Sequence, residues 1–176
     1  MNTRVLDELS EPEVRRYLEF LLWHYRVVDA FWFLQVTEAF DQVTAERLNE
    51  EVWERAGRLG AKAILERFGL RTGGLRGLVE AQRLYPWAVL IGYQFEEQED
   101  QVLLSVPSCP VQEARLRRGL GEYACREMHC REFTAFALEV DPRLRVECLF
   151  APPEPRREGL FCQWRFTLEE GTREGS

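Results

Sequence analysis

The spacing of hydrophobic residues changes near residue 89, and this change limits the folds that the chain can adopt. Before this point, apolar residues recur about every 3.6 residues, which is typical of helices. Beyond it they alternate with other residues, which is typical of strands. The alternating positions are Val89, Ile91, Tyr93 and Phe95, and then Val102, Leu104 and Val106. The polar residues EEQED between the two runs predict the turn of an antiparallel hairpin.

Two long helices are predicted in the first part of the chain. Ser10 and Glu13 form a capping box, and the apolar residues that follow, to about residue 40, cover nearly the whole circumference of a helix. We therefore expect this helix to be central and buried. The second helix has Thr44 as its N-cap and ends before Gly69, which can adopt the left-handed C-cap conformation.

The remaining elements are a short helix at residues 75–84, a helical region at residues 111–140 and a second hairpin at residues 144–168. Gly119 and Gly121 can interrupt the helical region. The two hairpins together give four strands. The predicted fold class is therefore α+β, with long N-terminal helices packed with a mostly antiparallel four-stranded sheet that a helix covers.

The size of the chain suits one compact unit. It has 176 residues, of which 45% are hydrophobic, enough to fill a core. We assign residues 1–72 to an N-terminal helical part and residues 73–176 to an α+β part that holds both hairpins. We expect the two parts to pack together as a single unit.

The charge of the chain excludes several classes of function. The net charge is −7, and acidic residues are spread along helical faces, which argues against binding to nucleic acid through its phosphates and against a membrane-surface role. The N-terminal residues MNTRVLDELSEPE carry acids where a signal peptide needs an apolar run. Charged residues also interrupt the apolar stretch at residues 18–36. We expect a cytoplasmic protein without a membrane partner.

The basic residues and cysteines point to origin and redox state. Lys62 is the only lysine among 23 basic residues, which suggests a GC-rich prokaryotic genome. The chain has five cysteines, an odd number, and no export signal. This combination favours thiols or metal ligands over a disulfide framework.

Two of the cysteines lie on the predicted C-terminal hairpin. Strand alternation places Cys148 and Cys162 on the inward faces of their strands. If the loop closes symmetrically about Pro155, the two residues lie opposite each other, with Cβ atoms about 4.5 to 5.5 Å apart. This separation would suit a shared metal ion.

Three upstream residues can complete such a site. Cys125 and His129 lie one turn apart on the predicted helix that covers the sheet, and Cys109 ends a strand at the same edge. Zinc accepts thiolate and imidazole ligands in any sequence order, so we predict a zinc site. Three interpretations stay open: buried free thiols, a metal held by at least three of the four cysteines, or a redox disulfide. The candidate ligands are Cys109, Cys125, Cys148, Cys162 and His129.

The first long helix carries ionisable residues on an otherwise apolar sequence, WHYRVVDAFWF. Buried ionisable groups need a polar partner, so His24 and Asp29 are candidate ligand-binding residues together with Trp32. One interpretation is a ligand pocket between this helix and the sheet, with Asp29 as its polar anchor. The other is a helix–helix contact in which Asp29 pairs with an arginine or a tryptophan N–H.

Several segments carry a resemblance to a known family. HYRVVDAFWFLQVTEAF, ERLNEEVWERAGRLGAKAI, CPVQEARLRRGL, DPRLRVEC and FCQWRF resemble an uncharacterised prokaryotic family similar to L-2-amino-thiazoline-4-carboxylic acid hydrolases, over residues 14–168. The C-terminal part is more remotely similar to the 4-vinyl-reductase domain, a ligand-sensing module. That resemblance implies zinc ligands at Cys125, Cys148 and Cys162. Arg145 stands where that zinc site has an acidic residue, so Cys109 or His129 would complete the coordination.

These observations lead to three hypotheses for function. The first is a small-molecule-binding module with a structural zinc held by cysteines. The second, implied by the resemblance, is a hydrolase of a small heterocyclic or amide substrate, with an open zinc position or an activated cysteine. The third is a metal-free interaction protein. A homodimer is left open beside a monomer.

Overall fold

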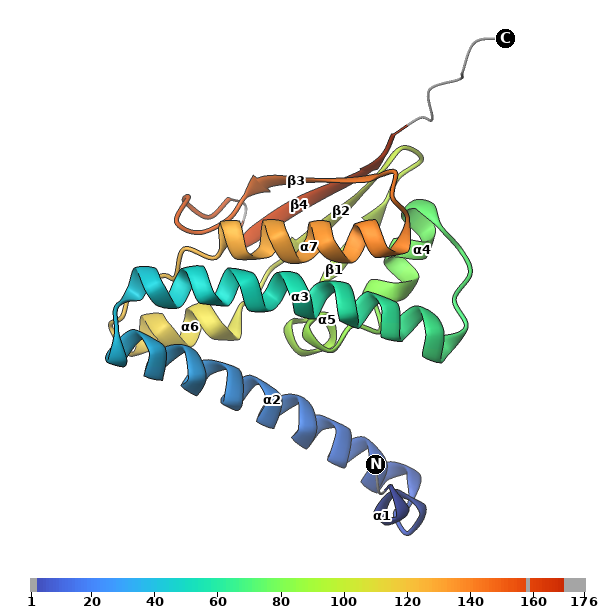
Figure 1. The fold of residues 1–176 in the computed structure, drawn as a ribbon, viewed down its shortest axis with the longest axis horizontal. Helices are drawn as coiled ribbons and strands as arrows, with labels where there is room; N and C mark the ends of the chain where they lie inside the picture. Colours follow the sequence, from blue (N-terminus) through green and yellow to red (C-terminus); the bar gives the residue numbers. More distant parts are fainter. Residues whose placement is uncertain (1–2, 158, 170–176) are drawn as a thin grey trace.

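The computed structural model describes residues 3–157 and 159–169 (Figure 1). Within this part, the chain forms seven helices and four strands. In order, they are α1 (Arg4–Asp7), α2 (Glu11–Ala39), α3 (Gln42–Phe68), α4 (Gly74–Gln82), α5 (Pro86–Ile91), β1 (Gln94–Glu97), β2 (Gln101–Val106), α6 (Pro110–Arg117), α7 (Arg126–Val140), β3 (Leu144–Phe150) and β4 (Cys162–Leu168).

The four strands form one antiparallel sheet in the order β1-β2-β4-β3. The first predicted hairpin is present as β1 and β2, and β3 and β4 also pair, so the α+β fold class is confirmed. β4 lies between β2 and β3. Two of its side chains, Trp164 and Phe166, are completely buried in the core.

The first hairpin begins later than the alternation of hydrophobic residues predicts. Val89 and Ile91 belong to helix α5 rather than to a strand. Pro86 occupies the first turn of this helix, where its fixed φ is favourable, and Gly92 ends it with a φ of 76°. A proline at the start and a glycine at the end therefore outweigh the alternating pattern.

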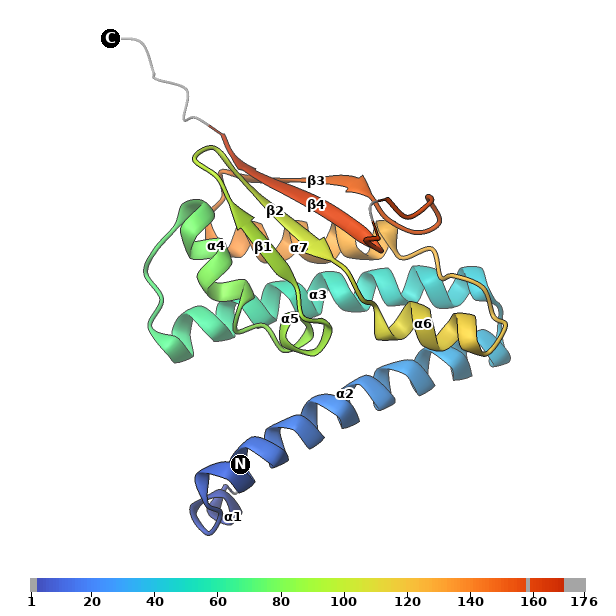
Figure 2. The same cartoon turned by 180° about the vertical axis from the view of Figure 1, so that it is seen from behind.

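The helices form layers below the sheet (Figures 1 and 2). α7 lies directly under the sheet and packs through Phe133 and Phe136, which are 1% and 0% exposed. α3 lies on the other side of α7. One hydrophobic core includes Trp53 and Ile64 from α3 together with side chains of α7 and the sheet, so the helical and the mixed parts of the chain share it.

α3 and α7 approach each other closely at a glycine. A Cβ atom on Gly57 would lie 2.7 Å from the carbonyl oxygen of Glu132 and 3.2 Å from its Cγ atom. One turn further on, Ala61 is completely buried. These small side chains allow the two backbones to come into contact.

α3 begins three residues earlier than predicted. Its N-cap is Asp41 rather than Thr44, and the Asp41 side chain accepts a hydrogen bond from the Thr44 amide at 2.7 Å.

The prediction that α2 is central and buried is wrong. The capping box of Ser10 and Glu13 is present, but none of the residues of α2, all of which are described, is buried. α2 forms the outermost layer and diverges from α3 toward its N-terminus (Figures 1 and 2). Apolar residues on all sides of a helix predict that each side is shielded from water. They do not show that the rest of the same chain provides the shielding. Among the described helices, none is both long and apolar enough to cross a membrane.

The contact at Gly57 generates a test of the fold. Gly57→Ala should destabilise the protein by about 1 to 3 kcal/mol, because the added methyl group meets backbone atoms that cannot rotate away. In an exposed helix, the same change would instead stabilise by about 1 kcal/mol. Urea unfolding followed by circular dichroism measures the difference. Glu66→Ala on the exposed side of α3 is the control and should change stability by less than about 0.5 kcal/mol. An increase in stability for Gly57→Ala would contradict the packing.

Candidate functional site

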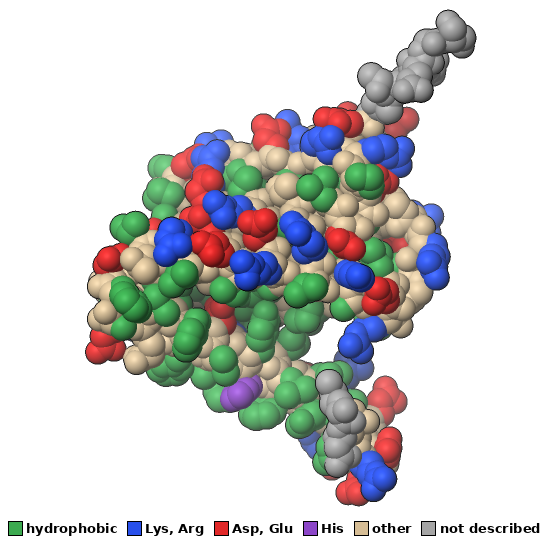
Figure 3. Space-filling model, in the orientation of Figure 1, with side chains coloured by type: hydrophobic (Ala, Val, Ile, Leu, Met, Phe, Trp, Pro, Cys, Tyr) green, Lys and Arg blue, Asp and Glu red, His purple; other side chains and the backbone are tan. Residues whose placement is uncertain are grey.

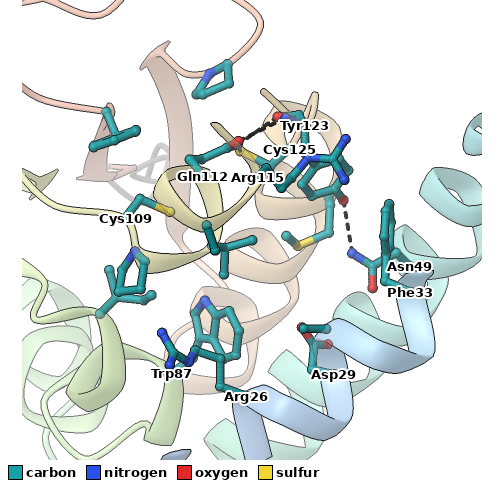
Figure 4. A pocket seen from close by; sticks show the side chains of 18 of the residues that line it. Arg26, Asp29, Phe33, Asn49, Trp87, Cys109, Gln112, Arg115, Tyr123 and Cys125 are labelled. Atoms are coloured by element: carbon teal, nitrogen blue, oxygen red, sulfur yellow. Dashed lines mark hydrogen bonds between the residues drawn. The ribbon is translucent and has the colours of Figure 1, made fainter. Parts of the chain in front are cut away.

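A cavity of about 350 Å³ lies between α2, α6 and α7 (Figure 4). α3, α5 and the ends of β2 and β4 complete its wall. The volume falls within the range of small-molecule sites, which is about 300 to 1,000 Å³. Most of the lining is apolar and includes Val27, Ile91, Val106, Val111, Met128 and Phe133. The cavity therefore suits a ligand with an apolar body.

Asp29 of α2 lines this cavity near Trp53 of α3. Its carboxylate accepts a hydrogen bond from the indole N–H of Trp53. The pKa of Asp29 is raised to about 6, mainly by burial and in addition by the negative charge of Glu132, although the Trp53 hydrogen bond and the charge of His129 act to lower it. Both interpretations of Asp29 thus describe part of its environment, since it lies in a cavity wall and in a helix–helix contact.

His24 and Trp32 do not line the cavity. Trp32 is 70% exposed, and His24 stacks on Phe20 with ring centroids 5.8 Å apart on the outer side of α2. His24 lies five residues before Asp29, which is about 140° away round the helix, and Trp32, about 60° away, is turned to solvent. Their assignment to a pocket beside Asp29 is therefore corrected.

Gln112 holds the cavity wall together where α6 meets α7. It is 1% exposed, and its amide donates to the carbonyl oxygen of Tyr123 at 2.8 Å and accepts from the Tyr123 amide N–H at 2.9 Å. Its Nε2 also lies 3.4 Å from the Sγ atom of Cys125. Asn49 of α3 donates to the Tyr123 hydroxyl at 2.9 Å. These bonds fix the loop between the two helices over the cavity (Figure 4).

The sequence gives little sign of this network. Gln112 lies in the segment PVQEARLR, which has weak amphipathic character and resembles a solvated helix. Only the tertiary contact with Tyr123 reveals that its amide is buried.

Four arginines also line the cavity: Arg26, Arg115, Arg117 and Arg118. The Arg115 guanidinium donates to the carbonyl oxygens of Leu120 and Gly121 and lies 6.0 Å from the ring centroid of Phe33. Arg117 lies 3.8 Å from a carboxylate oxygen of Glu113. In the part of the chain that is described, Arg26 and Arg118 have no carboxylate partner.

Three of the predicted metal ligands among the cysteines line the same cavity, namely Cys109, Cys125 and Cys162. Cys109 is the N-cap residue of α6 and Cys125 is the N-cap residue of α7, while Cys162 begins β4. Burial raises the pKa of all three thiols, that of Cys162 to about 12. They are therefore protonated near neutral pH, and protonated thiols are weak nucleophiles.

The predicted pairing of Cys148 with Cys162 is wrong. Cys148 lies opposite Trp164, and Cys162 lies opposite Val106 of the other neighbouring strand. The register between β3 and β4 shifts between Cys148 and Phe150, and the described residues 151–157 and 159–161 belong to neither strand. The assumption of a loop symmetric about Pro155 therefore displaced the expected partner. Cys148 does not line the cavity.

His129 also lines the cavity, but its partner is Glu132 and not one of the cysteines. Its Nδ1 atom lies 2.7 Å from Oε2 of Glu132, which is fully buried, and its ring stacks on Phe133 at 5.2 Å between centroids. Over residues 3–157 and 159–169, no group of three or more His, Cys, Asp or Glu side chains is arranged to hold a metal ion. The predicted zinc site stays a prediction for metal analysis to test.

The raised pKa of Asp29 predicts a specific dependence of stability on pH. Between about pH 4 and pH 6 the folded protein binds more protons at this carboxyl than the unfolded chain does, so its contribution to stability falls as pH rises. Asp29→Asn keeps an oxygen that accepts the Trp53 hydrogen bond but cannot ionise. It should remove this loss, which is about 2 kcal/mol between pH 4.5 and pH 7 for a pKa raised from 3.8 to about 6. Urea unfolding at pH 4.5 and pH 7 measures it, with exposed Asp100→Asn as the control. An equal pH dependence of Asp29→Asn and the unmodified protein would contradict the burial of Asp29.

The thiols provide a second test. Cys125 and Cys162 are each 6% exposed, so they should react slowly with a disulfide reagent until urea is added. All five thiols should react in denaturant, and a chelator should not change the native rate. Metal analysis on the same sample is the complementary measurement. About one zinc per chain, together with faster thiol reaction after chelation, would instead support the zinc site.

No curated protein matches this chain. Among solved structures, it is similar to a trafficking protein particle complex subunit 3 from Naegleria fowleri, crystallised with covalently bound palmitic acid. The identity is 13%, the match covers 89% of this chain and 97% of that chain, and the TM-score is 0.49. Residues 8–168 match a family described as a family of unknown function, DUF6125. The chain therefore belongs to the DUF6125 family.

Proposed function

We propose that the chain binds an amphipathic small molecule, with an apolar body and an anionic group, in the cavity between α2, α6 and α7. The observation that carries this proposal is an apolar cavity with four arginines in its lining, of which Arg26 and Arg118 have no carboxylate partner among the described residues. An unpaired guanidinium beside an apolar wall favours a ligand with an anionic group for the guanidinium and an apolar body for the wall.

The apolar lining would supply most of the binding free energy. Side chains such as Val111, Met128 and Phe133 come from different elements and present carbon atoms to one space. A ligand that buries about 200 Å² of apolar surface there would gain about 5 kcal/mol from its removal from water. This contribution does not require any particular shape of the apolar body.

The arginines would determine the charge of the ligand. A carboxylate or sulfonate can accept two parallel hydrogen bonds from one guanidinium. Asp29 lies in the same cavity and would repel an anion, so we place the anionic group toward α6, which carries Arg118, and the apolar body toward Asp29 and Trp53. Figure 4 shows Asp29 apart from Arg115 in the cavity wall, in agreement with this orientation.

Hydrolysis is a second candidate, favoured by one observation. His129 lines the cavity and is oriented by the buried carboxylate of Glu132, as a general base often is. The raised pKa of the Cys125 thiol, caused by burial, disfavours a thiolate nucleophile beside it. Turnover of L-2-amino-thiazoline-4-carboxylate that His129→Gln abolishes would support this candidate. Absence of turnover by the unmodified protein would remove it for that substrate.

Binding of decanoate and decanol, measured by titration calorimetry, tests the main proposal. Both molecules have the same apolar chain, and only decanoate carries a negative charge. We expect decanoate to bind more tightly. The double substitution Arg26→Ala/Arg118→Ala should weaken decanoate binding by about 10-fold or more and leave decanol binding nearly unchanged, because charged hydrogen bonds contribute about 1.5 to 3 kcal/mol.

Two further variants make this experiment specific. Arg71→Ala removes an exposed arginine outside the cavity and should bind decanoate as the unmodified protein does. Ala114→Trp places a large ring on the cavity lining and should weaken the binding of both molecules. Equal binding of decanoate and decanol would contradict the role of the arginines. Unchanged binding by Ala114→Trp would contradict the location of the site.

A further inference from the structure

The outer side of α2 exposes a continuous apolar surface. Figure 3 shows hydrophobic side chains gathered along this helix, with a histidine among them. The exposed fractions of these side chains range from 36% to 70%. The residues are Tyr17, Phe20, Leu21, Val28, Phe31 and Trp32, and we call them the α2 outer face.

The α2 outer face has the spacing of a coiled-coil seam. Along its centre, residues follow one another at steps of three, four, three, four and three: Val14, Tyr17, Leu21, His24, Val28 and Phe31. This alternation is the heptad pattern with which one helix packs against another. Several of these residues are exposed, so the seam is open to a helix from outside the domain.

The area of the α2 outer face matches the requirement of a stable dimer. Phe, Tyr and Trp side chains each have about 150 to 250 Å² of surface. At the observed exposures, the six side chains leave on the order of 600 Å² of apolar area open to water. Specific protein interfaces bury about 1,200 to 2,000 Å² in total, so the low end of this range is about 600 Å² on each side. One copy of the same face is therefore sufficient to cover the other.

We propose that two copies of the chain pair through their α2 outer faces, with the two helices antiparallel. When the two-fold axis passes between Leu22 and Trp23, all six seam residues of one copy meet seam residues of the other.

The shapes of the side chains support this register. Tyr17 lies at the level of Val28 of the other copy, and Phe31 lies at the level of Val14 of the other copy. A large side chain thus meets a small one at each of these levels, as close packing of facing helices requires. The same face therefore complements itself about a two-fold axis, which is the arrangement that homodimers use most often.

A second copy fits this surface better than a lipid bilayer does. The chain has a net charge of −7, which would be repelled by anionic lipids. The dimer can be tested apart from the proposed ligand site: Phe31 is the seam residue that also lines the cavity, whereas Leu21 and Val28, which the dimer test changes, do not line it. The two proposals can therefore fail separately.

Sedimentation equilibrium tests the dimer. The unmodified protein should have the mass of two chains at micromolar concentration, and Leu21→Glu/Val28→Glu should have the mass of one, with an unchanged circular dichroism spectrum and unchanged decanoate binding. Leu138→Glu is the matched control: Leu138 is 44% exposed against 41% for Leu21, but it lies on α7, so this variant should stay dimeric. His24→Leu removes the polar member of the seam and should lower the dimer dissociation constant about 10-fold.

Cross-linking tests the antiparallel register. Mild oxidation of Tyr17→Cys/Val28→Cys should join two chains, because each new thiol meets its counterpart in the other copy, and Tyr17→Cys alone should not. A monomeric unmodified protein, a dimer that persists in Leu21→Glu/Val28→Glu, or equal cross-linking by Tyr17→Cys alone would overturn the proposal. A protein that is monomeric and instead sediments with vesicles of phosphatidylglycerol would assign the face to a membrane and would also overturn it.

Discussion

The packing of α7 between α3 and the sheet is the constraint on which the rest of the structure depends. On one side, Phe133 contacts the buried rings of Trp164 and Phe166 of β4. On the other side, Gly57 lets the backbone of α3 contact that of α7 at Glu132. These contacts leave the N-terminal end of α7 fixed. The cavity lies at this end, because α6 and α2 enclose it without filling it.

α2 serves two surfaces at once. Its inner side contributes Arg26 and Asp29 to the cavity, and its outer side exposes the seam from Val14 to Phe31. Few contacts hold its N-terminal half to the body, since none of its residues is buried. Different residues of the helix form the two surfaces, and Phe31 is the seam residue that also lines the cavity.

Local signals in the sequence predict much of the fold. The capping box at Ser10, the left-handed Gly69 and the first hairpin depend on neighbouring residues, and the structure has all three. The errors arise where contacts between residues far apart in the sequence determine the structure. The apolar circumference of α2 could not reveal that its outer side lacks a covering element in the same chain. The position of Cys148 depends on a register shift that no pattern in the hairpin indicates.

The candidate site shows the same division. Asp29 was identified because a carboxylate in an apolar helix needs a special environment. Gln112 and the arginines of α6 were missed, since their segment has the composition of a solvated helix. Only the fold brings this helix against α2 and turns its polar side chains toward an apolar cavity.

Nuclear magnetic resonance of methyl-labelled methionine tests the central claim most directly. The chain has two methionines, and Met128 lines the cavity. With decanoate bound, the account predicts a changed Met128 methyl resonance and nuclear Overhauser contacts between this methyl group and the methylene protons of the ligand. Saturating decanoate that leaves the Met128 resonance unchanged and gives no such contacts would contradict the account.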